Sequence, residues 1–117
     1  MQNMFSEWIC TAKAAELWFH SAHHLTKGTG FAGDHVNLYG MIYTQLQAEF
    51  DAVAERALGL TNDEMLLCPK HILSGTSALL QHYPSTSNMS DHDIASAAYA
   101  LIVDYCKWEN NFHDRLD

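Results

Sequence analysis

The sequence predicts an all-α helical bundle, folded as a single domain over residues 1–117. Apolar residues recur every three or four positions through three long blocks, which is the period of an amphipathic helix. The alternation of apolar and polar residues that marks a half-buried strand is lacking. Glycine, proline and serine gather between the blocks, where they indicate turns. A chain of 117 residues can bury one modest core, so we expect one domain.

The first long helix is predicted from Met4 to Thr26. Three glycines within residues 28–33 end it, because glycine costs about 1 kcal/mol relative to alanine in a helix interior. We expect Trp8 and Trp18 to be core aromatics on account of their helical spacing. The apolar stripe of this helix consists of Phe5, Trp8, Ile9, Ala12, Ala15, Phe19 and Ala22.

The second long helix is predicted from His35, where Asp34 can cap it, to Leu58, where the sequence G-L-T-N-D begins to break it. These roughly 24 residues would span about 36 Å. Its apolar stripe consists of Leu38, Ile42, Leu46, Phe50 or Val53, and Ala57.

A short helix and a third long helix complete the prediction. Pro69 is well placed to open the short helix, and Pro84 ends it after Tyr83. Ser90 with an acidic residue three positions on resembles a helix start, and the last helix runs to about Arg115. The apolar face of this last helix consists of Ile94, Ala97, Ala98, Leu101, Ile102, Tyr105, Cys106 and Trp108 or Phe112.

Composition excludes several function classes. Six basic against fourteen acidic residues give a net charge of −8, which disfavours phosphate as a partner, so we expect no DNA binding. No apolar run approaches the roughly 20 residues that span a bilayer, so no membrane partner is expected. Cys10, Cys68 and Cys106 are odd in number and lack a CxxC spacing. We therefore expect the three cysteines to be small core residues with reduced thiols, which favours a cytoplasmic location.

Two acidic residues of the second helix are candidate metal ligands. Asp51 and Glu55 are four positions apart, so they share one helix face about one turn from each other. Taken alone, such a pair is more often a solvated face than a metal site. Whether this pair binds a metal depends on which other ligand side chains can approach it.

Histidines supply the other half of a candidate site. His20, His23 and His24 gather near the end of the first helix, and His35 lies at the start of the second. Spacings of three and four residues bring at least two of the imidazoles to one side. Imidazoles together with the carboxylates form the mixed nitrogen and oxygen set that holds iron or a similar divalent metal.

Two segments carry a resemblance to a known family. The run A-H-H-L-T-K-G-T-G-F-A-G-D-H over residues 22–35 and the ending D-A-V-A-E-R over residues 51–56 resemble the corner between helices A and B and the end of helix B in the Dps family, the ferritin-like DNA-protection-during-starvation proteins. Gly28 and Phe31 match positions of that motif. More faintly, residues 73–83 resemble the family's short crossover helix, and residues 93–108 its third long helix.

The resemblance implies a function and a site. His23 and His35 of one subunit, with Asp51 and Glu55 of a partner subunit, would form a one- or two-iron oxidation site across a dimer interface. The implied function is that of an iron-binding Dps-like ferritin, which oxidises Fe(II) with peroxide or dioxygen and can sequester the ferric product. Such a protein would be a homo-oligomer, at least a dimer and in the family's complete form a dodecamer.

Two other functions stay open. The first is a degenerate ferritin-like dimeric helical interaction protein without ferroxidase activity. The second, ranked last, is a small metal hydrolase, which would need an open coordination position and a general base. Whether the protein is an enzyme is therefore undecided at the level of sequence.

The chain also departs from the family pattern near the site. The interval from His35 to Asp51 is one residue longer than usual, which would turn the carboxylates by about 100° on a regular helix. We therefore predict a π-bulge near Gly40 that absorbs the extra residue. Tyr39 replaces a family carboxylate, and His24 replaces an aromatic residue. His20 or His24 could compensate as a further ligand, or act by hydrogen bonding to one.

A further departure concerns the fourth long helix of the family, which the sequence does not contain. The short helix over residues 69–83 could fill its place, a second subunit could pack there, or the sequence could come from a longer chain. Apolar stripes on three helices favour oligomers, because uncovered stripes of several hundred Å² are uncommon on a monomer. The resemblance thus implies a shortened ferritin-like bundle of three long helices and one short crossover helix.

Overall fold

A computed structural model of the protein describes residues 2–26 and 38–116, and all regular structure in these two ranges is helical. Its elements are α1 (Gln2–Leu25), α2 (Met41–Thr61), a single 3₁₀ turn (Glu64–Leu67), α3 (Pro69–Leu80) and α4 (Asp91–Leu116). The prediction of an all-α bundle with three long helices and one short helix is therefore confirmed. No helix of the described ranges is long and apolar enough to cross a membrane.

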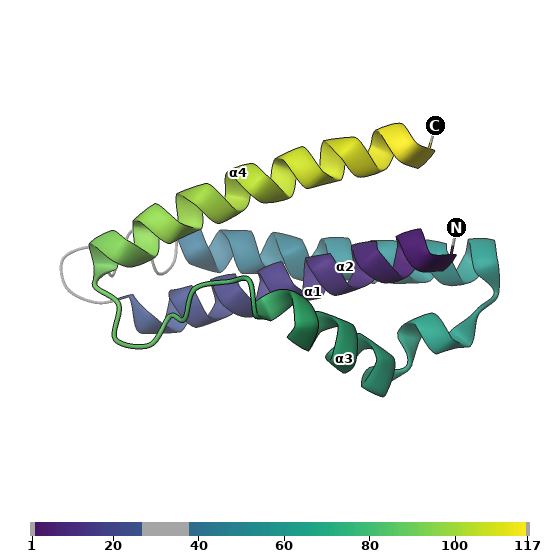
Figure 1. Ribbon diagram of the computed structural model, residues 1–117, viewed down its shortest axis with the longest axis horizontal. Coiled ribbons are helices and arrows are strands. Elements are labelled where there is room, and N and C mark those ends of the chain that lie inside the picture. Colours follow the sequence, from purple (N-terminus) through teal and green to yellow (C-terminus); the bar gives the residue numbers. More distant parts are fainter. Residues whose placement is uncertain (1, 27–37, 117) are drawn as a thin grey trace.

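The helices form an antiparallel pair with a third long helix laid over it. Figure 1 shows α1 and α2 side by side in opposite directions, with α4 above them in the same direction as α2. After α2 the chain turns back under the pair as α3 and continues in the same direction through the irregular segment 81–90 to the start of α4. This crossover spans much of the length of the bundle, and it is what allows α2 and α4 to run in the same direction.

α1 agrees closely with its prediction. All seven residues of its expected stripe are buried, and so is Trp18. The indole of Trp18 donates a hydrogen bond to the carbonyl of Pro84 at 2.9 Å, which joins α1 to the returning crossover. At the end of the helix, the hydroxyl of Thr26 donates to the carbonyl of Ala22 at 2.7 Å.

α2 extends further than predicted at its carboxyl end. We expected it to end at Leu58 because Gly59 follows, but the helix continues to Thr61. Asn62 then adopts a left-handed conformation (φ 54°), and its N–H donates to the carbonyl of Leu58. Asparagine tolerates this conformation and can replace glycine as the terminating residue. One internal glycine costs too little to stop a helix that packs well.

α3 is shorter than expected and lies very close to α1. Pro69 occupies its first turn as predicted, but the helix ends at Leu80 and the chain leaves it before Tyr83. At Gly75 an added Cβ would lie 2.5 Å from the sulfur of Cys10. Glycine thus allows the two helices to approach at this point.

α4 begins where predicted and packs through two aromatic and aliphatic clusters. The Ser90 hydroxyl accepts a hydrogen bond from the N–H of Asp93 at 3.1 Å, as expected of a helix start. Ile94, Ala98 and Tyr105 join the core with the second half of α1. Nearer the carboxyl end, Phe112 packs 4.5 Å from Trp8, measured between ring centroids.

The prediction for the cysteines is partly wrong. All three are free thiols, but only Cys10 is buried, and Cys106 is exposed. Cys106 follows the buried Tyr105, and the next residue on a helix is rotated by about 100°, away from the core.

Candidate functional site

The histidines at the carboxyl end of α1 form a cluster of rings with a tyrosine of α2. The ring of His20 stacks on that of Tyr43, with centroids 4.2 Å apart and an interplanar angle of 13°. His23 lies 5.1 Å from the same ring, and His24 lies 4.6 Å from His20. His20 and His23 are half-buried, whereas His24 is exposed. The predicted grouping of imidazoles is therefore present.

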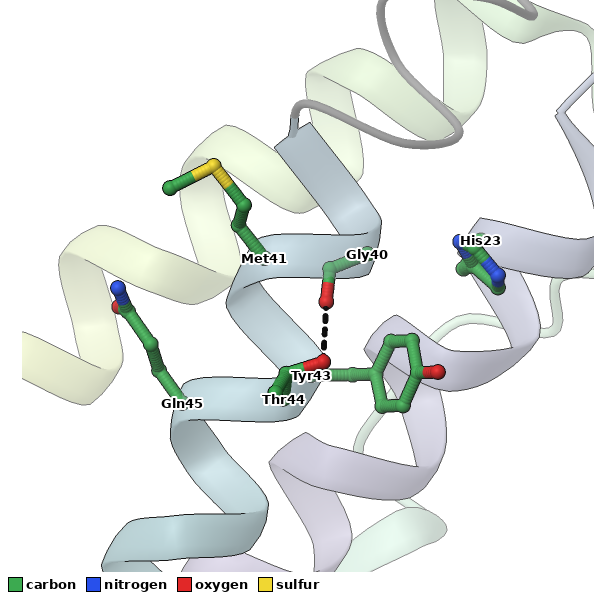
Figure 2. A pocket seen from close by; sticks show the side chains of 6 residues that line it. All are labelled: His23, Gly40, Met41, Tyr43, Thr44 and Gln45. Carbon is green, nitrogen blue, oxygen red and sulfur yellow. Dashed lines mark hydrogen bonds between the residues drawn. The ribbon is translucent and has the colours of Figure 1, made fainter.

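His23 borders an open hollow at the amino end of α2, with a volume of about 450 Å³. Figure 2 shows His23 approaching from α1 while Tyr43 projects from α2 toward it. The hydroxyl of Thr44 donates a hydrogen bond to the carbonyl of Gly40 at 2.7 Å, which fixes the first turn of α2 beside the hollow. Of the predicted ligands in the described ranges, His23 is therefore one that borders this hollow.

The backbone just before α2 is π-helical over residues 38–40. The predicted π segment near Gly40 is thus present, directly before α2 begins at Met41. Tyr39 in this turn is almost fully buried and packs on Phe19, with ring centroids 6.4 Å apart. Its ring belongs to the core, where the family pattern would have a carboxylate. His35, which the π turn was expected to realign, lies outside the described residues, as do Gly28 and Phe31.

Asp51 and Glu55 project outward from the middle of α2. Both are exposed, while Val53 and Ala54 between them are buried. This arrangement follows from helix geometry, because α1 and α4 cover one side of α2 and the carboxylates lie on another. The two carboxylates are one turn apart and open to any molecule that approaches α2 from outside.

Within one chain, His23 of α1 lies apart from these carboxylates. Tyr43, which contacts His23, precedes Asp51 by eight residues, or about 12 Å along the helix. Within the two described ranges, no three His, Cys, Asp or Glu side chains are close enough together to hold a metal ion. A single chain therefore does not bring His23 together with Asp51 and Glu55.

A second acidic group, between α2 and α4, was not predicted. The Oε1 atom of Glu49 and the hydroxyl of Tyr105 are both shielded from solvent. Burial is the largest cause that raises the pKa of the Glu109 carboxyl, and the neighbouring Glu49 raises it further. His113 lowers this pKa. The imidazole of His113 lies 3.9 Å from Glu109. Burial likewise raises the pKa of Tyr105, again with Glu49 as the next cause. The spacing of four residues between Glu109 and His113 was the sequence feature that could have indicated this acidic group.

Comparison with known proteins identifies no relative of this chain. No protein-family model matches it, and no curated protein or solved structure does so either. The resemblance to the Dps family therefore stays a prediction based on the residues themselves.

Proposed function

We propose that the protein is a Dps-like ferritin that binds Fe(II) between two copies of the chain and oxidises it. His23 and His35 of one copy and Asp51 and Glu55 of the other would provide the ligands, with His20 or His24 as an additional one. The ferric product would be sequestered if enough copies assemble to enclose it. The expected partners are thus Fe(II), peroxide or dioxygen, and further copies of the chain, in a cytoplasmic setting that suits three free thiols.

The observation that carries this proposal is the separation of the two ligand sets within one chain. Asp51 and Glu55 are exposed on the outside of α2, and His23 borders an open hollow about 12 Å further along. Two copies related by a two-fold axis place equivalent surfaces against each other, with residue i facing j and j facing i. Such an axis can bring the carboxylates of each copy to the imidazoles of the other, which makes two equal sites.

The order of the helices also supports the proposal. A ferritin-like bundle has a long crossover after its second helix, and the crossover here contains the short helix α3 and leads to α4, which runs parallel to α2. The π turn at residues 38–40 agrees with the adjustment that the longer interval between His35 and Asp51 requires.

The chemistry follows from the donor types. Neutral imidazoles suit Fe(II), and carboxylate oxygens suit the harder Fe(III), so the mixed set binds the reactant and favours its oxidation. Each Fe(II) gives up one electron, so two ions supply the two electrons that reduce one peroxide. Fourteen acidic against six basic residues would attract the cation toward the protein.

The direct test is anaerobic titration with Fe(II), followed by peroxide or air and by measurement of the ferric absorbance. We expect His23→Ala, His35→Ala and Asp51→Ala each to lower the initial rate at least tenfold. His92→Ala and Asp114→Ala are matched controls, because both residues are exposed and outside the site, and they should keep the parent's rate.

Mixing two inactive variants tests whether the site lies between subunits. A dimer of one His23→Ala chain and one Asp51→Ala chain contains one site with all its ligands and one site that lacks both. Random exchange should therefore restore about a quarter of the parent's sites. A mixture as inactive as its components would show that both ligands act within one chain. Unchanged oxidation in all single variants would instead favour the helical interaction protein without ferroxidase activity.

A further inference from the structure

A pocket of about 320 Å³ lies between the first half of α1, the end of α3 and the middle of α4. Glu7 and Thr11 line it from α1, and because they are four residues apart they share one face of that helix. Asp104 and Trp108 line it from α4 and share a face for the same reason. The chain that follows α3 forms a further wall.

Hydrogen bonds hold these walls together. The indole N–H of Trp108 donates to Oε1 of Glu7 at 2.8 Å, which joins α4 to α1. The N–H of Tyr83 donates to the carbonyl of Leu80 at 3.0 Å, which fixes the turn after α3. The next carbonyl, that of Pro84, accepts a hydrogen bond from Trp18 of α1, as described above. The pocket is therefore formed by segments that are already held in place, as is usual for small-molecule sites.

Three aromatic side chains line the pocket, namely Tyr83, Tyr105 and Trp108. The rings of Tyr105 and Trp108 have their centroids 6.0 Å apart. The face of an aromatic ring is electron-rich and attracts a cation, most strongly in tryptophan and tyrosine. The rings also provide apolar surface for the body of a ligand.

The charges around the pocket are acidic. Glu7 and Asp104 line it, and none of the described residues that line it is lysine or arginine. Glu7 is in part balanced already, because Arg115 lies 3.4 Å from its Oε1 atom. Both Trp108 and Arg115 contact this one oxygen of Glu7.

Asp104 is the carboxylate whose charge is left unbalanced. It forms no ion pair with any residue that the structure describes, including Lys107 three residues further along the helix. Its charge reaches the pocket, because it adds to burial, the larger cause, in raising the pKa of Tyr83. An unbalanced carboxylate beside aromatic rings favours a ligand with a positive charge.

The pocket suits an organic cation better than a metal ion. His82 also lines it, so an imidazole and two carboxylates border the same space. Within the described ranges, however, no three such side chains are close enough together to hold a metal ion. Most of the other lining side chains are apolar or aromatic, which suits a ligand with an apolar body. The volume is near the lower end of the range for small-molecule sites.

We infer that this pocket binds a small organic cation, an ammonium ion with an apolar body, whose charge lies beside Asp104 and whose body lies among the rings of Tyr83, Tyr105 and Trp108. The site shares no residue with the one proposed for iron, so it stands whether or not the protein binds iron.

Three probes with the same apolar body and different charges test the inference: n-hexylammonium, n-hexanol and hexanoate. Each is titrated into the ¹⁵N-labelled full chain, and the signal of the Trp108 indole N–H, identified with Trp108→Phe, is followed by NMR. Hexylammonium should shift this signal saturably and bind about fivefold more tightly than hexanol, while hexanoate should cause no saturable shift. Equal affinities for hexylammonium and hexanol, or a hexylammonium shift that does not saturate, would overturn the inference.

Two charge variants of α4 locate the cation. Asp104→Asn should weaken the binding of hexylammonium about fivefold. Asp93→Asn is the matched control, since it removes the same charge from the same helix about 16 Å away. Both side chains are exposed, so both variants should keep the parent's circular dichroism. An unchanged affinity in Asp104→Asn, or an equal loss in both variants, would contradict a site at Asp104.

Two variants of Tyr83 test the contribution of the rings. Tyr83→Leu keeps an apolar side chain but removes the ring, so hexylammonium should bind about threefold more weakly. Tyr83→Phe keeps the ring and should keep the parent's affinity. Equal affinities in the leucine and phenylalanine variants would show that the ring of Tyr83 does not contact the cation.

Discussion

At the scale of the residue, two glycines in helices have opposite structural roles. Gly75 lies where α3 meets α1, and a Cβ added there would be 2.5 Å from the sulfur of Cys10 and 3.4 Å from its Cβ. Gly59 lies in the last turns of α2, and a Cβ added there would meet nothing within 4 Å. Helix propensity favours alanine at both positions, so packing alone distinguishes them.

We expect Gly75→Ala and Gly59→Ala to change stability with opposite signs. Gly75→Ala should lower the free energy of unfolding by about 1–3 kcal/mol, since the extra methyl group overpacks the contact. Gly59→Ala should raise it by about 0.5–1 kcal/mol through the lower entropy of the unfolded chain and better helix propensity. Urea unfolding at one fixed protein concentration measures both.

The double variant Cys10→Ala/Gly75→Ala isolates the contact responsible. Removal of the sulfur provides space for the new methyl group, so the loss caused by Gly75→Ala should be at least halved in the Cys10→Ala background. Equal losses in the two backgrounds would show that the sulfur contact is not the cause.

At the scale of the element, the existence of each helix was easier to predict from the sequence than the position of its ends. The apolar stripe of α1 was correct at every position because its period is unbroken over five turns. The end of α2 was misplaced, since the cost of Gly59 was overestimated and the left-handed Asn62 was not recognised as the cap. The π turn was predictable only because a resemblance provided an interval to compare. The group of Glu49, Tyr105 and Glu109 could not be predicted from the sequence, because it depends on how α4 lies against α2.

The start of α4 provides a prediction about an element. Ser90 accepts a hydrogen bond from the N–H of Asp93, so Ser90→Ala should lower the free energy of unfolding by about 1 kcal/mol. Ser96→Ala is the control, because Ser96 is exposed inside the same helix and its change should stay within about 0.5 kcal/mol. If both variants unfold at the same urea concentration, the hydroxyl of Ser90 does not cap the helix in solution.

At the scale of the whole molecule, the attachment of α4 combines apolar packing with polar groups that are only partly buried. Phe112 and Tyr105 anchor the helix in the two core clusters. Trp108 donates a hydrogen bond to Glu7 at 2.8 Å, which ties the carboxyl half of α4 to α1. Glu109 lies among these groups with Glu49 as its acidic neighbour, so the same attachment includes a carboxyl group that resists ionisation.

We expect this carboxyl group to make the stability of the fold depend on pH. The pKa of Glu109 is raised from 4.5 in the folded protein, first by burial and then by Glu49. The folded state thus holds the proton more tightly than the unfolded state, and the resulting stability is fully present below pH 4.5 and is lost as pH rises through the raised pKa. Other carboxyl groups shape the overall profile, so the informative quantity is the difference between the parent and Glu109→Gln. That difference should grow in favour of the variant with increasing pH above 4.5, because the amide cannot ionise beside Glu49.

Glu64→Gln, at an exposed position of the 3₁₀ turn, should show no such trend in urea unfolding followed by tryptophan fluorescence. A constant difference between Glu109→Gln and the parent across this pH range would mean that the carboxyl group of Glu109 ionises as easily in the folded protein as in the unfolded chain.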